Sequence, residues 1–431
     1  MNLGGLSPDK APPVDAPLGL FYLMPPFLAL AGLVLAWQGD QVLLSRWSPA
    51  ALAVTHFLVL GALAPVMCGA LLQISPVLFG TPFPRVRLVA RLTSTGLGIG
   101  ALLIGTGFLA GYPSMLLSGG AVAAAGLVVF LAGSWRALAH GSAATAASLW
   151  TVRLSAAALA VTVLFGLMLA LSRAGWLALP GHLGWVDTHV SWGLAGWIGL
   201  LLAGVGMEII PLFYISPPFA AWLKRALPFA VFGLLVLITL LATQVHAVPM
   251  LNAAVVALFL VHLLYNAAAL YVEQRRQRPR RDANLWLWQG SHLAVFGAFA
   301  AWFGGAAQSL VGVLLLAAAL AFMIGSLMKI VPFLTWLDLH QRRAAGGHLH
   351  VSLPRLGMLL PEKVANGVAF TLGAATIAVL LGPFLPLTAR LGGGLLVLCA
   401  MLLGLSLARA GRARNTVIDR FGSVSYTHLT L

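Results

Sequence analysis

The sequence predicts an all-α, polytopic membrane protein. Of its 431 residues 60% are hydrophobic and only 8% are charged, whereas an ordinary soluble domain carries about 25% charged residues. The apolar residues come in runs of about 20, the length that a helix needs to cross a hydrocarbon core of about 30 Å. Short basic stretches separate these runs. We therefore predict a single membrane domain of about twelve transmembrane helices.

The apolar runs place the expected helices in order along the chain. The predicted spans are 17–37, 49–74, 90–111, 114–134, 150–172, 186–210, 226–246, 250–272, 285–303, 306–334, 364–385 and 392–409. Residues 1–16 and 410–431 flank this membrane domain, 17–409. The first run is too long for the core of a cleavable signal peptide. The final SVSYTHLTL departs from the basic pattern before it, and we interpret it as non-native read-through.

The distribution of basic residues predicts the orientation. If the N-terminus is cytoplasmic, the inside loops hold most Lys and Arg, including the clusters 275–281 and 409–420, and the outside loops hold only Arg46, Arg173 and Arg390. Such an asymmetry follows the positive-inside rule and predicts that both termini are cytoplasmic. It also accounts for the net charge of +15, so we expect a lipid bilayer and not nucleic acid as the partner.

A short pattern returns three times. A polar residue, an isoleucine, any residue, a proline and two apolar residues recur within LLQISPVLFG (71–80), GMEIIPLFYI (206–215) and LMKIVPFLTW (327–336). These segments end predicted helices two, six and ten on the inner side. A fixed period indicates a repeated unit, and a period of four helices predicts quasi-repeats at about 17–134, 150–272 and 285–409.

The polar members of this pattern are Gln73, Glu208 and Lys329. A bare charge at the bilayer centre costs about 2.5–3.5 kcal/mol on insertion scales. We therefore predict that Glu208 and Lys329 neutralise one another in an inner polar layer, with Gln73 nearby. A role in proton entry is the alternative.

Two histidines occupy matching positions in the outer part of helices two and six. His56 and His189 each follow a threonine and precede the proline of their unit by 20 and 22 residues, whereas the third unit has Gln308 and Ser309 at this level. Imidazole is a common ligand of copper and heme iron. We predict that His56 and His189 bind a cofactor, with His246 as a third metal ligand beside His189. The alternatives are hydrogen bonds to neighbouring helices, and for His246 contact with lipid headgroups.

Helix two resembles that of the heme–copper oxidase catalytic subunit, in which an outer histidine that ligates the low-spin heme precedes glycines and a proline-to-glycine end. The matching residues here are His56, Gly61, Gly69, Pro76, Gly80, Phe83, Pro84 and Arg85. Helix six of that family carries a copper-ligand histidine, which His189 matches. The family's adjacent histidine pair on helix seven is reduced to His246, and the His-x-His of its helix ten is missing. The chain therefore looks like a reduced member, similar to the NnrS-like twelve-helix proteins of denitrifying bacteria.

The resemblance implies a protein of the bacterial cytoplasmic membrane that binds heme b, copper or both and is not a complete terminal oxidase. It implies a link to nitric oxide and denitrification or to the assembly of respiratory complexes, with proteins of those systems as partners. Two alternatives stay open: a structural assembly partner, and a cofactor-free transporter whose helices break near Pro76, Pro211 and Pro332 to line a path.

Overall fold

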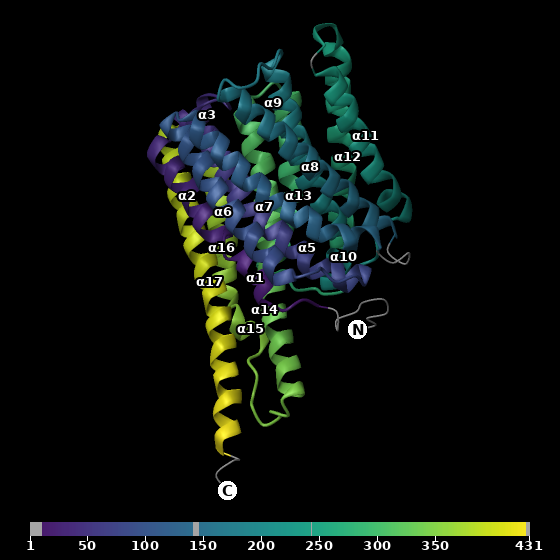
Figure 1. Ribbon diagram of the computed structural model, residues 1–431, viewed down its shortest axis with the longest axis vertical. Helices are drawn as coiled ribbons and strands as arrows, with labels where there is room; N and C mark the ends of the chain where they lie inside the picture. The colour runs from purple at the N-terminus through teal and green to yellow at the C-terminus, as the bar shows by residue number, and fades with distance from the viewer. Residues whose placement is uncertain (1–10, 141–145, 243, 428–431) are drawn as a thin grey trace.

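A computed structural model describes residues 11–140, 146–242 and 244–427. Every element within these ranges is a helix, and eleven helical spans are long and apolar enough to cross a membrane. The predicted class, an all-α polytopic membrane protein, is therefore confirmed. Figure 1 shows the helices standing side by side in one bundle.

The helices follow the predicted spans in chain order. They are α1 (Asp15–Phe21), α2 (Met24–Gln38), α3 (Gln41–Leu44), α4 (Pro49–His56), the π-helix η2 (Phe57–Leu63), α5 (Ala64–Phe79), α6 (Val86–Ala110), α7 (Pro113–Ala139), α8 (Ala146–Arg173), α9 (His182–Ser191), the π-helix η4 (Trp192–Gly199), α10 (Leu200–Tyr214), α11 (Ala221–Leu241), the short 3-10 helix η5 (Val245–Ala247), α12 (Val248–Gln274), α13 (Ala283–Phe303), α14 (Gln308–Ala345), α15 (Leu356–Leu359), α16 (Glu362–Leu381) and α17 (Pro386–Thr427). The first predicted span comprises α1 and α2, the second α4, η2 and α5, and the sixth α9, η4 and α10.

The ninth predicted span, 285–303, forms α13, which packs along α14. It is not among the eleven apolar spans. Its tryptophans and the polar residues Asn284, Gln289 and His292 lower its hydropathy. The described residues therefore contain eleven spans long and apolar enough to cross a membrane, and a twelfth crossing by α13 stays a prediction.

Helices α14 and α17 run on past the apolar bundle and project together from one end (Figure 1). We call this the inner end and the end that holds α3 the outer end. Leu339 of α14 packs with Val417 and Phe421 of α17, and Asp338 accepts a hydrogen bond from Arg414 Nε at 2.9 Å. The region after the predicted span 306–334 therefore begins as helix, and the predicted tail from 410 is helical up to Thr427. Residues 428–431 lie outside the described ranges.

Local sequence explains how several helices begin and end. Ser48 caps α4 by accepting a hydrogen bond from the Ala51 amide at 3.1 Å, and proline follows at the first helical position. Helices α5 and α10 end alike, because a left-handed residue, Gly80 or Ile215, donates its N–H to the carbonyl of the repeat proline four residues earlier.

The repeat prolines lie inside continuous helices, near the ends of α5 and α10 and 13 residues before the end of α14. The expectation that the helices break there is wrong. Pro76 and Pro211 lie in the last turn of α5 and α10, so little helix follows them. Helix α14 continues beyond Pro332 and contacts α17.

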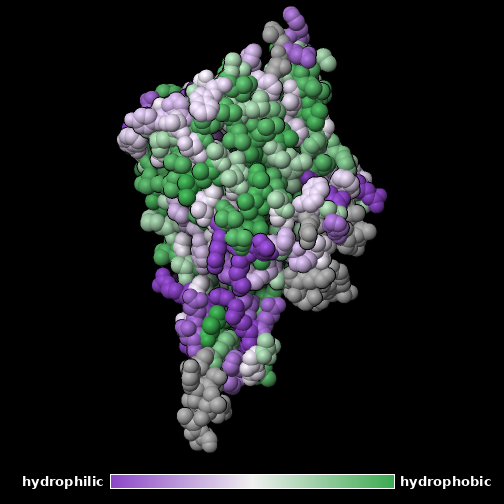
Figure 2. Space-filling model, viewed as in Figure 1, coloured by the Kyte–Doolittle hydropathy of each residue, from purple (hydrophilic) through white to green (hydrophobic). Residues whose placement is uncertain are grey.

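Small residues allow α2 and α17 to cross closely. A Cβ atom added to Gly393 of α17 would lie 2.3 Å from the Ala36 nitrogen and 2.6 Å from the Gly32 oxygen of α2. Backbones this close are typical of membrane helices that pack through glycine. Figure 2 shows apolar side chains over the bundle and a hydrophilic zone beneath them, where α14 and α17 project.

Candidate functional site

The two predicted site histidines lie at a shared structural feature. His56 is the last residue of α4 and directly precedes η2, and His189 lies near the end of α9, three residues before η4. The corresponding part of α14 is a continuous α-helix. π-Helical turns are rare and occur frequently at functional sites.

The threonine before each histidine also behaves alike in the two helices. The Thr55 hydroxyl donates to the Ala51 carbonyl and the Thr188 hydroxyl to the Gly184 carbonyl, both at 2.8 Å. The shared sequence of the two units therefore gives the same local hydrogen bond just before the helix changes its winding.

Both imidazoles use Nδ1 to contact a backbone carbonyl. His56 Nδ1 lies 2.7 Å from the Leu52 oxygen on its own helix, and His189 Nδ1 lies 3.0 Å from the Thr162 oxygen on α8. A carbonyl only accepts, so Nδ1 carries the hydrogen and Nε2 of the neutral ring carries a lone pair. Among the described residues neither Nε2 has a hydrogen-bond partner. This is the arrangement of a histidine that ligates a metal through Nε2.

The two histidines come from different helices to the same region. The ion pair of Arg46, ahead of α4, with Asp187 of α9 joins the outer ends of these two helices. Gly166 of α8 makes room for His189, because a Cβ atom there would lie 3.1 Å from its Cε1. Phe108 of α6 packs beside His56, with the ring centres 5.2 Å apart. The convergence of His56 and His189 on one site stays a prediction.

The two imidazoles are suitable ligands for a metal ion or a heme iron. Imidazole nitrogens suit copper, and heme iron takes axial histidines. No group of three or more His, Cys, Asp or Glu residues is gathered within the described residues. Two cavities, of about 20 and 140 Å³, are lined by neither His56 nor His189, and pockets for larger ligands occupy about 300–1,000 Å³.

His246 does not join this pair. It lies in η5, at the tip of the α11–α12 hairpin, with its side chain exposed. Among the described residues, His246 therefore does not form a three-ligand group with His56 and His189. His262 of α12 lies within the bundle and contacts two backbone carbonyls. Its Nδ1 lies 3.0 Å from the Leu258 oxygen and its Nε2 3.3 Å from the Ala195 oxygen within η4, which supports the π-helical segment.

The predicted pairing of Glu208 with Lys329 is wrong. Glu208 accepts hydrogen bonds from Lys224 at 2.7 Å and from the Ser148 hydroxyl, whereas Lys329 pairs with Asp282. Each charge finds an opposite charge at the start of another helix on the inner side, Lys224 in the first turn of α11 and Asp282 at the N-cap of α13.

The Lys329 pair belongs to a small network. The Tyr214 hydroxyl lies 2.7 Å from Asp282 Oδ1 and 2.5 Å from Asn284 Oδ1, and Asn284 donates to the Gly325 carbonyl at 2.7 Å. Burial opposes the ionisation of Asp282, but the hydrogen bonds from Lys329 and Tyr214 outweigh it and hold the pKa of this carboxyl below its usual range. We call these four residues, Tyr214, Asp282, Asn284 and Lys329, the inner cluster.

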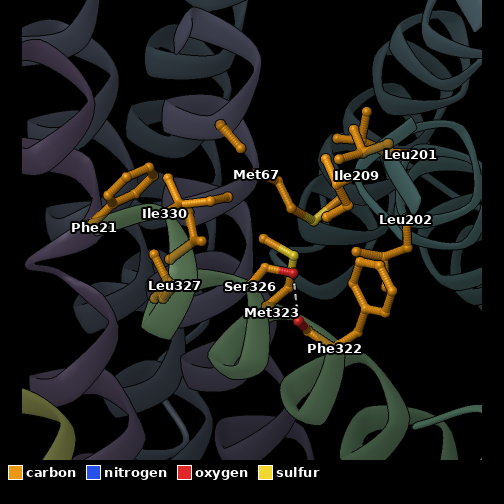
Figure 3. Close-up of a pocket in the computed structure, with 13 residues that line it drawn as sticks. Phe21, Met67, Leu201, Leu202, Ile209, Phe322, Met323, Ser326, Leu327 and Ile330 are labelled. Carbon is orange, nitrogen blue, oxygen red and sulfur yellow. Dashed lines mark hydrogen bonds between the residues drawn. The ribbon is translucent and has the colours of Figure 1, made fainter. Parts of the chain in front are cut away.

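Gln73 belongs to neither ion pair. Its side chain is buried, and its Oε1 has no hydrogen-bond partner among the described residues. The three helices that carry the predicted polar layer instead meet through apolar side chains (Figure 3). Met67 of α5, Ile209 of α10 and Met323 of α14 line the 20 Å³ cavity there, and the one polar side chain, Ser326, donates to the Phe322 carbonyl at 2.7 Å. The three helices share an apolar contact instead of one polar layer.

Neither the known protein-family models nor the curated proteins include a match to this chain.

Proposed function

We propose that this multi-pass membrane protein binds heme b or copper through His56 and His189 in the outer half of its bundle. The observation that carries the proposal is the matched state of the two rings. Each donates Nδ1–H to a backbone carbonyl, and each leaves the Nε2 lone pair without a hydrogen-bond partner among the described residues. His262 differs, because both of its ring nitrogens face backbone carbonyls.

In this proposal the chain is a reduced, NnrS-like relative of the heme–copper oxidases. It lies in the bacterial cytoplasmic membrane with both termini in the cytoplasm, as the basic loops favour. A bound heme or copper ion supplies one-electron chemistry and an affinity for diatomic gases such as nitric oxide. The chain supplies two oriented nitrogens, and the carbonyls of Leu52 and Thr162 raise the basicity of the imidazoles that they hold.

The proposed role is the handling of nitric oxide or the assembly of respiratory complexes, without the complete ligand set of a terminal oxidase. The absence from the sequence of the second histidine of the helix-seven pair and of the helix-ten His-x-His supports this limit. Proteins of denitrification or of the respiratory chain are the proposed partners.

The test is a reduced-minus-oxidised visible spectrum of the purified protein together with metal analysis. We expect a Soret band or stoichiometric copper that is lost or altered in His56→Ala and His189→Ala. His340→Ala is the matched control, because His340 Nδ1 also contacts the carbonyl four residues earlier, at 2.9 Å, but lies at the inner end. A protein with neither heme nor copper would leave the cofactor-free transporter or the structural assembly partner.

A further inference from the structure

A second pair of ionisable side chains lies in the inner half of the bundle, apart from the histidine site. Glu273 of α12 and His292 of α13 are 0% and 1% exposed, with Oε1 and Nε2 3.4 Å apart. Neither carboxylate oxygen, nor His292 Nε2, has a hydrogen-bond partner among the described residues. Glutamate is almost never fully buried unless it is paired.

The neighbouring amide fixes which nitrogen of His292 carries a hydrogen. Asn266 Nδ2 donates to the His262 carbonyl at 2.8 Å, so its Oδ1 is the atom that faces His292 Nδ1 at 2.7 Å. An amide oxygen only accepts, and Nδ1 is therefore the donor. In the neutral ring, Nε2 then presents a lone pair to Glu273.

This assignment leaves two favourable states for the pair. Either Glu273 is a carboxylic acid that donates to Nε2, or His292 is an imidazolium whose Nε2–H faces the carboxylate. In both states one proton lies between Oε1 and Nε2, and the pair has no net charge. With no such proton, two acceptors would face each other beside a buried, uncompensated charge, which costs several kcal/mol.

The charged groups nearby do not replace this proton. The closest cation in sequence, Arg275, lies over the Tyr271 ring, 4.5 Å from its centre. The next, Arg276, uses Nη1 to donate to the backbone carbonyl of Glu273 and not to its carboxylate. Lys329 is paired with Asp282, Lys224 with Glu208, and Arg280 with Glu362. A phenol also faces the pair, because the Tyr265 ring lies edge-on to His292 with the ring centres 6.1 Å apart. From α14 the pair meets the ring of Phe322.

We propose that Glu273 and His292 form a proton-binding site that holds one proton between Oε1 and Nε2. When the proton moves across the pair, the O–H bond breaks and the N–H bond forms, and no charge leaves the site. Because Nδ1 is committed to Asn266, the pair stores a proton and does not pass it further along α13. A metal ion fits this pair less well than a proton does. A structural metal site takes about four ligands, and no third His, Cys, Asp or Glu joins the pair within the described ranges.

The proton can be observed directly near neutral pH, where free Glu and His, with pKa values of about 4.3 and 6.5, mostly lack it. Infrared spectroscopy in H₂O and D₂O detects a neutral carboxylic acid, and ¹⁵N NMR of labelled histidine detects an imidazolium. We expect one of the two signals in the wild-type protein and its loss in Glu273→Gln. Glu208→Gln is the matched control, because Glu208 has Lys224 and Ser148 as partners, and it should leave the signal unchanged.

A second variant separates the two states. His292→Gln removes the base, so the proton must stay on Glu273, and the infrared carboxylic acid signal should be present at full intensity. A wild-type protein with an ionised Glu273 and a neutral His292 near neutral pH would overturn the proposal, and this measurement needs no variant to fold. Stoichiometric metal that is lost in Glu273→Gln would overturn it in favour of a metal site.

Discussion

The crossing of α2 and α17 makes a prediction that two adjacent glycines can test. Alanine at Gly393 would place its Cβ atom 2.3 Å from a backbone nitrogen of α2, about 1 Å short of the 3.4 Å at which ordinary contact begins. Alanine at Gly394, the next residue, would meet nothing within 4 Å. The two substitutions change the same helix in the same way and differ only in what the new methyl group meets.

The expected magnitude follows from two opposing effects. Replacing glycine by alanine inside a helix is favourable by about 0.5–1 kcal/mol, and forcing an extra methyl group into a packed contact costs about 1–3 kcal/mol. Gly394→Ala should therefore stabilise the protein by about 0.5–1 kcal/mol. Gly393→Ala should be less stable than Gly394→Ala by about 1–3 kcal/mol, because the helix contribution cancels between them. The obstacle is backbone and not a flexible side chain, so the helices must move apart.

The assay is reversible unfolding in mixed micelles with an increasing fraction of sodium dodecyl sulfate, followed by tryptophan fluorescence. The difference between the two midpoints, converted with a common slope, gives the difference in free energy of unfolding. Equal stability of the two variants would refute the close crossing, and so would a more stable Gly393→Ala.

Three further predictions concern the inner side. Glu208→Gln should increase the reactivity of Lys224 toward amine reagents and leave that of Lys329 unchanged; the reverse pattern would restore the pairing expected from sequence. The pKa of Asp282 is lowered in the folded state, so the ionised carboxylate stabilises the fold at pH values above the ordinary pKa of 3.8. This stabilisation is lost as the pH falls through the lower folded-state pKa. Acid unfolding of Asp282→Asn should not show this loss. Ile215→Gly should raise the free energy of unfolding by about 1 kcal/mol, because a β-branched residue at φ 51° is strained; a lower unfolding midpoint would contradict this.

Hydropathy was sufficient to predict where the helices lie, because the length of an apolar run is a local property of the sequence. It was not sufficient for the inner extensions of α14 and α17. Their polar turns are stabilised by Leu339, Val417 and Phe421 across two distant segments, and by the pairing of Asp338 with Arg414. Such contacts depend on which helices lie next to one another in the folded bundle, and this is not a local property of the sequence.

The same limit explains the errors at the candidate sites. The repeat identified Glu208 and Lys329 as functional or paired, but their partners are set by the placement of α11 and α13 and not by the repeat. Glu273 was overlooked because it stands directly before a run of arginines, QRRQRPRR, and resembles a surface residue. The shared Thr-His position on two helices could be predicted from the sequence. The π-helical segments could not, because no sequence pattern distinguishes them from α-helix.

The π-helical segments also separate two parts of each helix that would otherwise turn together. An α-helix advances by about 100° per residue, and a π-helical turn accommodates an extra residue without breaking the chain. Removing one residue from 57–63 would therefore let this segment return to α-helical winding. Each of these helices thus has a segment between its histidine and its proline-bearing end in which a change of one residue in length can be taken up.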